Sequence, residues 1–140
     1  MLEVRLLDWQ SAQAEAKRVR FVVFVEEQGV PADLEMDDMD AKCIHALAYG
    51  DGRVVATGRL LPDGHIGRMA VVKDWRRRGV GAELLDALLA EARRRGLAEV
   101  RLTAPLQALE FYRSQGFVAD GKVQQVEGVL QQAMRKPLAG

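Results

Sequence analysis

The chain has 140 residues, 49% of them hydrophobic, so we expect one domain over residues 1–140 with a substantial core. Twenty Lys and Arg side chains balance twenty Asp and Glu, and this zero formal net charge argues against a protein built to bind nucleic acid or an anionic membrane. The one cysteine, Cys43, excludes an internal disulfide and a multi-cysteine metal site, so we predict no bound metal and a core role for that thiol.

The first residues alternate apolar and charged side chains (LEVRLL, residues 2–7), which predicts a strand. This segment has no long hydrophobic run, so we expect neither a signal peptide nor a membrane anchor and predict a cytoplasmic protein. Asp8 or Ser11 is suited to cap a following helix. Residues 21–25 (FVVFV) fit either a strand, by their β-branched content, or one face of a helix.

Residues 28–41 are predicted to form a loop, since they contain Gly29, Pro31 and a run of acidic side chains. One interpretation is a solvated acidic loop. The other is an anionic rim that attracts a cationic amine. The local composition alone leaves both open.

Three antiparallel strands are predicted between residues 43 and 72. Residues 43–50 and 53–61 are apolar runs separated by Asp51-Gly52, a pair typical of a two-residue hairpin turn. Asp63-Gly64 provides the next turn, and residues 66–72 form the third run.

A basic stretch with two glycines, RRRGVGA at residues 76–82, follows this third strand and precedes a predicted helix. The helix is indicated by apolar residues at helical spacing (Leu84, Leu85, Leu88, Leu89 and Ala92), and Gly96 ends it. Unpaired N–H groups of a first helical turn, glycines that admit an anion and arginines beside them favour phosphate binding. The stretch lacks the Lys-Ser/Thr pair of a P-loop and the three-glycine spacing of a dinucleotide fold.

The last part of the chain is predicted to contain a strand at residues 99–103 and a short helix at 106–115, closed by Gly116. Two final strands follow at residues 117–119 and 129–135, as a hairpin across the Asp120-Gly121 region.

Two of these stretches together are similar to the GNAT superfamily of acetyl-CoA-dependent N-acetyltransferases: MAVVKDWRRRGVGAELL (69–85) and FYRSQGF (111–117). VFVEEQGVP (23–31), with Glu35, Asp37 and His45, further resembles the ElaA-like branch. The resemblance implies an α/β (α+β) fold, a mixed and mostly antiparallel twisted sheet of six to seven strands flanked by about four helices. It also favours the helical interpretation of residues 21–25, as the buried end of the first helix.

The resemblance implies that acetyl-CoA is the cosubstrate and that its acetyl group passes directly to the amine of a small acceptor. The pantetheine arm would pair with the backbone of Met69, Ala70 and Val71, and the sheet must splay near Met69 to receive it. The pyrophosphate would lie on a second set of residues, namely Arg76, Arg77, Arg78, Gly79, Val80, Gly81 and Ala82.

Tyr112 matches the tyrosine of the family's FY-x-x-x-GF motif and is our candidate general acid, although a Phe-Tyr pair on a short helix is also ordinary core packing. His45 is the better of two histidine candidates for the general base, with Glu27, Glu35 or deprotonation through water as alternatives. The residues that would bind the acceptor on the acidic-rim interpretation are Glu27, Gln28, Glu35 and Asp37.

Three positions depart from the family pattern: Pro105 replaces a common Asn or Gln, Gln131 replaces a histidine of the branch, and Gly29 replaces an Asn. Pro105 and Gln131 motivate an alternative, a non-catalytic acyl-CoA-binding regulatory module. A nucleic-acid binder using Arg76 to Arg78 with Arg93 to Arg95 is opposed by the charge balance and by the lack of interleaved aromatic residues. Exposed apolar residues of the final strands would suit a homodimer.

Overall fold

A computed structural model describes residues 2–32, 37–126 and 128–138. The N-terminal half forms an antiparallel sheet in chain order, with strands β1 (Leu2–Leu7), β2 (Ile44–Gly50), β3 (Arg53–Leu60) and β4 (Ile66–Val71). Asp51 and Gly52, both at positive φ, make the β2–β3 turn as predicted.

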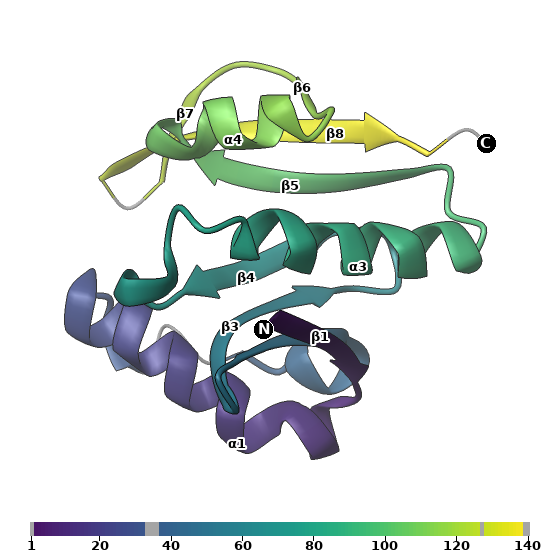
Figure 1. Cartoon of the computed structure of the whole chain (residues 1–140). Helices are drawn as coiled ribbons and strands as arrows, with labels where there is room; N and C mark the ends of the chain where they lie inside the picture. The colour runs from purple at the N-terminus through teal and green to yellow at the C-terminus, as the bar shows by residue number, and fades with distance from the viewer. Residues whose placement is uncertain (1, 33–36, 127, 139–140) are drawn as a thin grey trace.

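The C-terminal half forms a second antiparallel sheet around the long strand β8 (Val129–Pro137). Its partners are β5 (Glu99–Pro105), β6 (Val118–Ala119) and β7 (Gln124–Val126). Among the described residues the two sheets are joined at one point, where His65, just before β4, forms an isolated parallel β-bridge with Arg101 of β5. Beyond that bridge β4 and β5 separate, as Figure 1 shows, so the edge of β4 that faces away from β3 has no partner strand.

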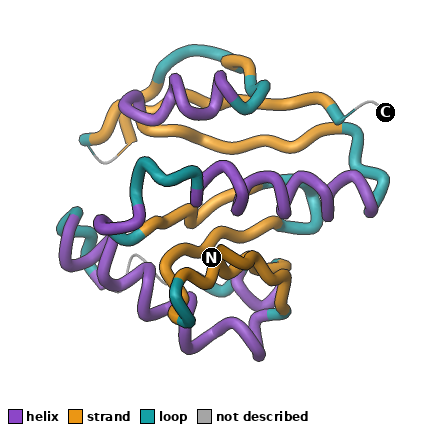
Figure 2. The backbone as a smooth tube through the Cα atoms, in the orientation of Figure 1, coloured by secondary structure: helices purple, strands orange, loops and turns teal. Residues whose placement is uncertain are grey.

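Helices cover both sheets (Figure 2). The longer helices are α1 (Trp9–Arg20), which continues as the π-helix η1 (Phe21–Glu27), and α3 (Val80–Arg94); the shorter α4 (Leu109–Ser114) precedes β6. Short 3-10 turns occupy η2 (Asp40–Lys42), η3 (Lys73–Trp75) and η4 (Leu106–Ala108). No helix within the described ranges is long and apolar enough to cross a membrane.

The core lies on both faces of the first sheet. The predicted apolar stripe of α3 is confirmed, since Leu84, Leu85 and Leu88 are buried against the sheet. On the other face, Ala12, Ala16 and Val19 of α1 pack with Leu47 and Val54. The Asp8 side chain accepts a hydrogen bond of 2.9 Å from the Ser11 N–H and so caps α1, as one of two predicted alternatives.

The predicted fold class is confirmed, with differences in detail. Eight strands are found in the described part of the chain, against six or seven predicted, because β7 forms a hairpin with β8 through Gly128. The helix predicted at 106–115 is divided into η4 and α4. Residues 21–25 are helical as predicted. Of these five residues only Val23 is fully buried, and Phe21, on the solvent side of η1, is 46% exposed.

Candidate active site

The unpaired edge of β4 presents backbone groups on the side that faces the second sheet (Figure 1). The Val72 N–H bonds to the Val55 carbonyl at 2.9 Å, so the backbone of Val72 faces β3. Successive residues of a strand turn their backbone groups to opposite sides. The N–H and C=O of Val71, and by the same alternation those of Met69, therefore point to the unpaired edge, whereas Ala70 faces Thr57 in β3. Of the three predicted pantetheine partners, Ala70 is thus already used within the sheet.

A β-bulge interrupts β4 at this place. The register with β3 shifts between Thr57 and Arg59, and Arg68 adopts a φ of 50°, in the left-handed region that side chains other than glycine rarely enter. Bulges and strained backbone of this kind are concentrated next to active sites, where they redirect backbone groups. The bulge separates Met69 and Val71 from the regularly paired start of the strand.

The turn that begins α3 is built to receive an anion. Gly79 precedes the helix at a φ of 80°, Arg77 adopts a φ of 63°, and no side chain caps the helix. The first-turn N–H groups, at Val80, Gly81 and Ala82, have no carbonyl partner inside the helix and carry the positive end of its dipole. Alternation of left- and right-handed residues forms a concavity of N–H groups, which is a common anion-binding geometry.

The three arginines before the turn differ in what they contact. Arg76 donates from both terminal nitrogens to the Glu27 carboxylate, at 2.5 and 2.7 Å, and from Nε to the Val71 carbonyl at 2.9 Å. In this structure the Arg76 guanidinium is thus directed to Glu27 and Val71, and its predicted phosphate contact stays a prediction. Arg78 stacks over the Trp75 ring, 4.8 Å from its centroid, and Arg77 is exposed. Arg77 and Arg78 make no ion pair with any described residue.

Tyr112 lies close to the glycine turn. Its ring contacts Phe111 edge-on, with centroids 5.0 Å apart, and a Cβ placed on Gly81 would lie 3.4 Å from the Phe111 ring. The Tyr112 side chain is largely buried, and this burial raises its pKa to about 12, so the hydroxyl keeps its proton at neutral pH. The structure thus brings the candidate acid and the candidate phosphate site into one region.

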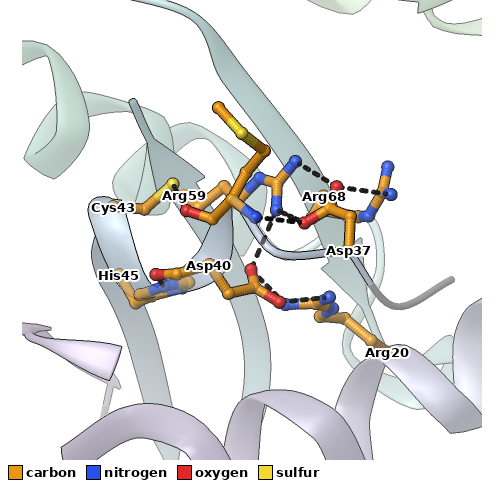
Figure 3. A network of polar contacts seen from close by, with 8 residues as sticks. Arg20, Asp37, Asp40, Cys43, His45, Arg59 and Arg68 are labelled. Carbon is orange, nitrogen blue, oxygen red and sulfur yellow. Dashed lines mark hydrogen bonds and ion pairs between the residues drawn. The ribbon is translucent and has the colours of Figure 1, made fainter. Parts of the chain in front are cut away.

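An ion network joins the end of α1 to the first sheet (Figure 3). Asp40 accepts from both Arg20 terminal nitrogens at 3.0 Å and from Arg59 at 2.9 Å, and Arg59 also binds Asp37 at 2.8 and 3.0 Å. Arg68 reaches the same Asp37 carboxylate at 3.2 Å. Hydrogen bonds from Arg59 lower the pKa of Asp37 to about 2. Burial would raise the pKa of Asp40, but hydrogen bonds from Arg20 and Arg59 outweigh it and lower that pKa.

His45 lies beside this ion network and bonds to Asp40. It is 1% exposed, stacks on Trp9 with ring centroids 4.8 Å apart, and donates from Nε2 to the Asp40 carbonyl at 2.9 Å. Burial lowers its pKa, so the imidazole is neutral, but it is enclosed away from the unpaired edge of β4. This geometry gives His45 a packing role and offers no route by which it would meet an acceptor amine. Cys43 is buried as expected, and burial raises its pKa to about 11.

The acidic rim is already neutralised where the structure describes it. Glu27 is paired with Arg76, Asp37 is paired with Arg59 and Arg68, and Gln28 is exposed at the end of η1. Glu35 lies outside the described residues. Glu27 and Asp37 are therefore held by arginines, whereas Asp38 of the same loop is exposed. No cluster of three potential metal ligands is found among the residues described.

Two of the residues that depart from the family pattern lie opposite each other in the second sheet. Pro105 ends β5 and lies directly opposite Gln131 of β8 in the antiparallel register. Sequence reasoning missed the roles of Arg20 and Arg59, because each depends on a partner distant in the chain. The one available signal was the number of arginines on otherwise apolar segments, which predicts internal carboxylate partners without identifying them.

Known proteins are similar to this chain in sequence and in fold. The N-acetyltransferase YjcF of Bacillus subtilis (strain 168), itself uncharacterized, is 36% identical over 102 residues, which cover 71% of this chain and 73% of that protein. The solved structure of Escherichia coli ElaA superimposes with a TM-score of 0.86 at 27% identity and covers 97% of this chain and 99% of its own. An acyl-CoA N-acyltransferase from Pseudomonas aeruginosa gives a TM-score of 0.84 at 28% identity, with the same coverage of both chains. The sequence profile of the acetyltransferase (GNAT) domain matches residues 11–138, and the chain therefore belongs to the GNAT acetyltransferase family.

Proposed function

We propose that this protein transfers the acetyl group of acetyl-CoA to the amine of a small acceptor. The observation that carries the proposal is a juxtaposition: the unpaired, bulged edge of β4 ends beside the uncapped glycine turn of α3. An amide-bearing arm can add to such a strand edge, while its phosphates bind the N–H groups of the turn. Acetyl-CoA has both parts in one molecule.

The donor would be held by two groups of residues. Met69 and Val71 offer outward backbone groups to the pantetheine arm. The N–H groups of the turn from Gly79 to Ala82 would bind the pyrophosphate, and the exposed guanidiniums of Arg77 and Arg78 would add charge-assisted hydrogen bonds. The bare Gly81 allows close approach at the point where Phe111 packs beneath the turn.

Transfer needs no covalent intermediate on the protein. The lone pair of a neutral amine attacks the thioester carbonyl, a C–N bond forms, and the C–S bond breaks with the electron pair leaving on sulfur. The amine proton passes to water, the Tyr112 hydroxyl gives its proton to the departing thiolate, and the Tyr112 phenolate then regains a proton from water. The raised pKa of Tyr112 keeps the hydroxyl protonated before the step.

The acceptor site would lie beside η1 and the loop that carries Asp37. Because Glu27 and Asp37 already bind arginines, these carboxylates contribute less attraction for a cationic amine than their number suggests. A small amine that reaches the thioester in its neutral form fits this arrangement. Val118, Val129 and Leu130 are 45–49% exposed on the second sheet, and a homodimer through them remains a prediction.

Release of CoA thiol tests the proposed reaction. The purified protein is incubated with acetyl-CoA and each member of a panel of small primary amines, polyamines and amino acids, and free thiol is measured with time. We expect amine-dependent thiol release above the rate of hydrolysis for at least one acceptor class. Tight acetyl-CoA binding without release for any amine would overturn the enzymatic proposal and would favour a non-catalytic acyl-CoA-binding module.

A further inference from the structure

Arg76 links three segments of the chain through one guanidinium. Its Nε donates to the carbonyl of Val71, the last residue of β4, and its two terminal nitrogens hold the carboxylate of Glu27 at the end of η1. These bonds use every nitrogen of the side chain. We call this arrangement the Glu27–Arg76 clasp. The hydrogen bond from Arg76 lowers the pKa of Glu27, so its carboxylate stays charged at neutral pH.

The clasp covers a backbone acceptor that strand addition would require. The Val71 carbonyl points to the unpaired edge of β4, because Val72 pairs with Val55 of β3. An arm that adds to this edge pairs with the outward carbonyls of β4, and Arg76 Nε already lies 2.9 Å from the last of them. Donor binding and the clasp therefore compete for the same oxygen.

We propose that Glu27 is a positioning residue that restrains donor binding by holding Arg76 on the Val71 carbonyl. This inference depends on the proposed function, since it concerns the same donor edge. When the donor adds to β4, the Arg76 Nε to Val71 bond breaks and the guanidinium moves away from the edge. Glu27 opposes that movement, because the charged pair is bidentate and short.

The restraint is modest, because both partners are about one-third exposed. An exposed ion pair of good geometry corresponds to an equilibrium shift of about two- to fivefold. Glu27→Ala should therefore tighten CoA binding by about two- to fivefold and lower the KM for acetyl-CoA by a similar factor. Arg76→Ala should tighten binding by a similar factor, and the double variant should add nothing, since either change alone frees the carbonyl.

Isothermal titration tests the clasp with two probes, CoA and ADP. ADP carries the adenosine and diphosphate but has no pantetheine arm, so its affinity should not change in any variant. The matched control is Glu26→Ala, which removes the same charge one residue earlier from an exposed side chain with no ion pair among the described residues. Thermal melting of each variant shows that folding is retained.

Tighter CoA binding in Glu27→Ala and Arg76→Ala, with Glu26→Ala and all ADP affinities unchanged, is the expected result. Weaker CoA binding in Arg76→Ala would overturn the inference, because it would make Arg76 a phosphate ligand. Unchanged CoA binding in Glu27→Ala, or equal tightening in Glu26→Ala, would also overturn it. Wild-type binding of CoA separates these outcomes from failure of the proposed donor site, in which no form of the protein would bind CoA. Failure of the proposed transfer reaction is separate again, since it would leave CoA binding intact without amine-dependent thiol release.

Discussion

Asp40 is the centre of the buried ion network, and Asp40→Asn removes its charge with almost no change of shape. The carboxylate is 2% exposed and receives three hydrogen bonds, two from Arg20, which is 1% exposed, and one from Arg59. Asparagine keeps one oxygen acceptor but removes the negative charge that Asp40 places against the buried Arg20 guanidinium. Breaking a buried pair in this way costs about 3–5 kcal/mol of unfolding free energy, which is a large share of the roughly 5–15 kcal/mol typical of a domain.

Urea unfolding measures this loss. With an m-value of about 2 kcal/mol per M, a loss of about 4 kcal/mol lowers the midpoint by about 2 M while the slope stays unchanged. The matched control is Glu3→Gln, which breaks the exposed Glu3–Arg5 pair and should leave the urea midpoint nearly unchanged. If Asp40→Asn lost as little as this control, the network would not stabilise the fold as its burial indicates.

Three further outcomes follow from the structure. The pKa of Asp37 is lower in the folded protein than in the unfolded chain, so about 2 kcal/mol of unfolding free energy present above pH 4 is lost as pH falls toward 2. Urea unfolding at a series of pH values should show a correspondingly weaker acid dependence for Asp37→Asn than for the wild type. Tyr112→Phe should lower kcat by about 100-fold or more in the thiol-release assay while CoA affinity by titration changes little; an unchanged kcat would refute the acid role. Gly58→Ala should lower the unfolding free energy by about 1–3 kcal/mol, because its Cβ would displace the Met69 sulfur and lie 3.3 Å from both Leu84 and Leu88 of α3; a thermal melt equal to wild type would show that this packing is loose.

Local patterns predicted most of the elements correctly. The helix period around Leu84, the turn pair at Asp51-Gly52 and the cap at Asp8 are each determined by neighbours a few residues away, and each is found as predicted. The short strand β7 was missed, because the polar Gln124 and Gln125 show no apolar alternation and become a strand through pairing with β8.

The candidate site could be predicted only in part. Gly79 and Arg77 take positive φ at the predicted turn, and Val71 faces the unpaired edge. The pairing of charges could not be predicted, because Glu27 and Arg76 are 49 residues apart and no local period relates them. For the same reason the pairing of Asp37 with Arg59 and Arg68 could not be predicted, and its role in acceptor binding stays a prediction.

The central claim is that an acyl-CoA binds at the glycine turn of α3, and titration calorimetry of acetyl-CoA against wild type and Arg77→Gly tests it most directly. Glycine accepts the positive φ of Arg77 without strain and removes the guanidinium side chain. The control, Arg93→Ala, removes a charge from the opposite end of α3, about 20 Å away along the helix. The account predicts micromolar binding to wild type and the control, and about tenfold weaker binding to Arg77→Gly. Equal affinity in all three, or no binding to wild type, would contradict it.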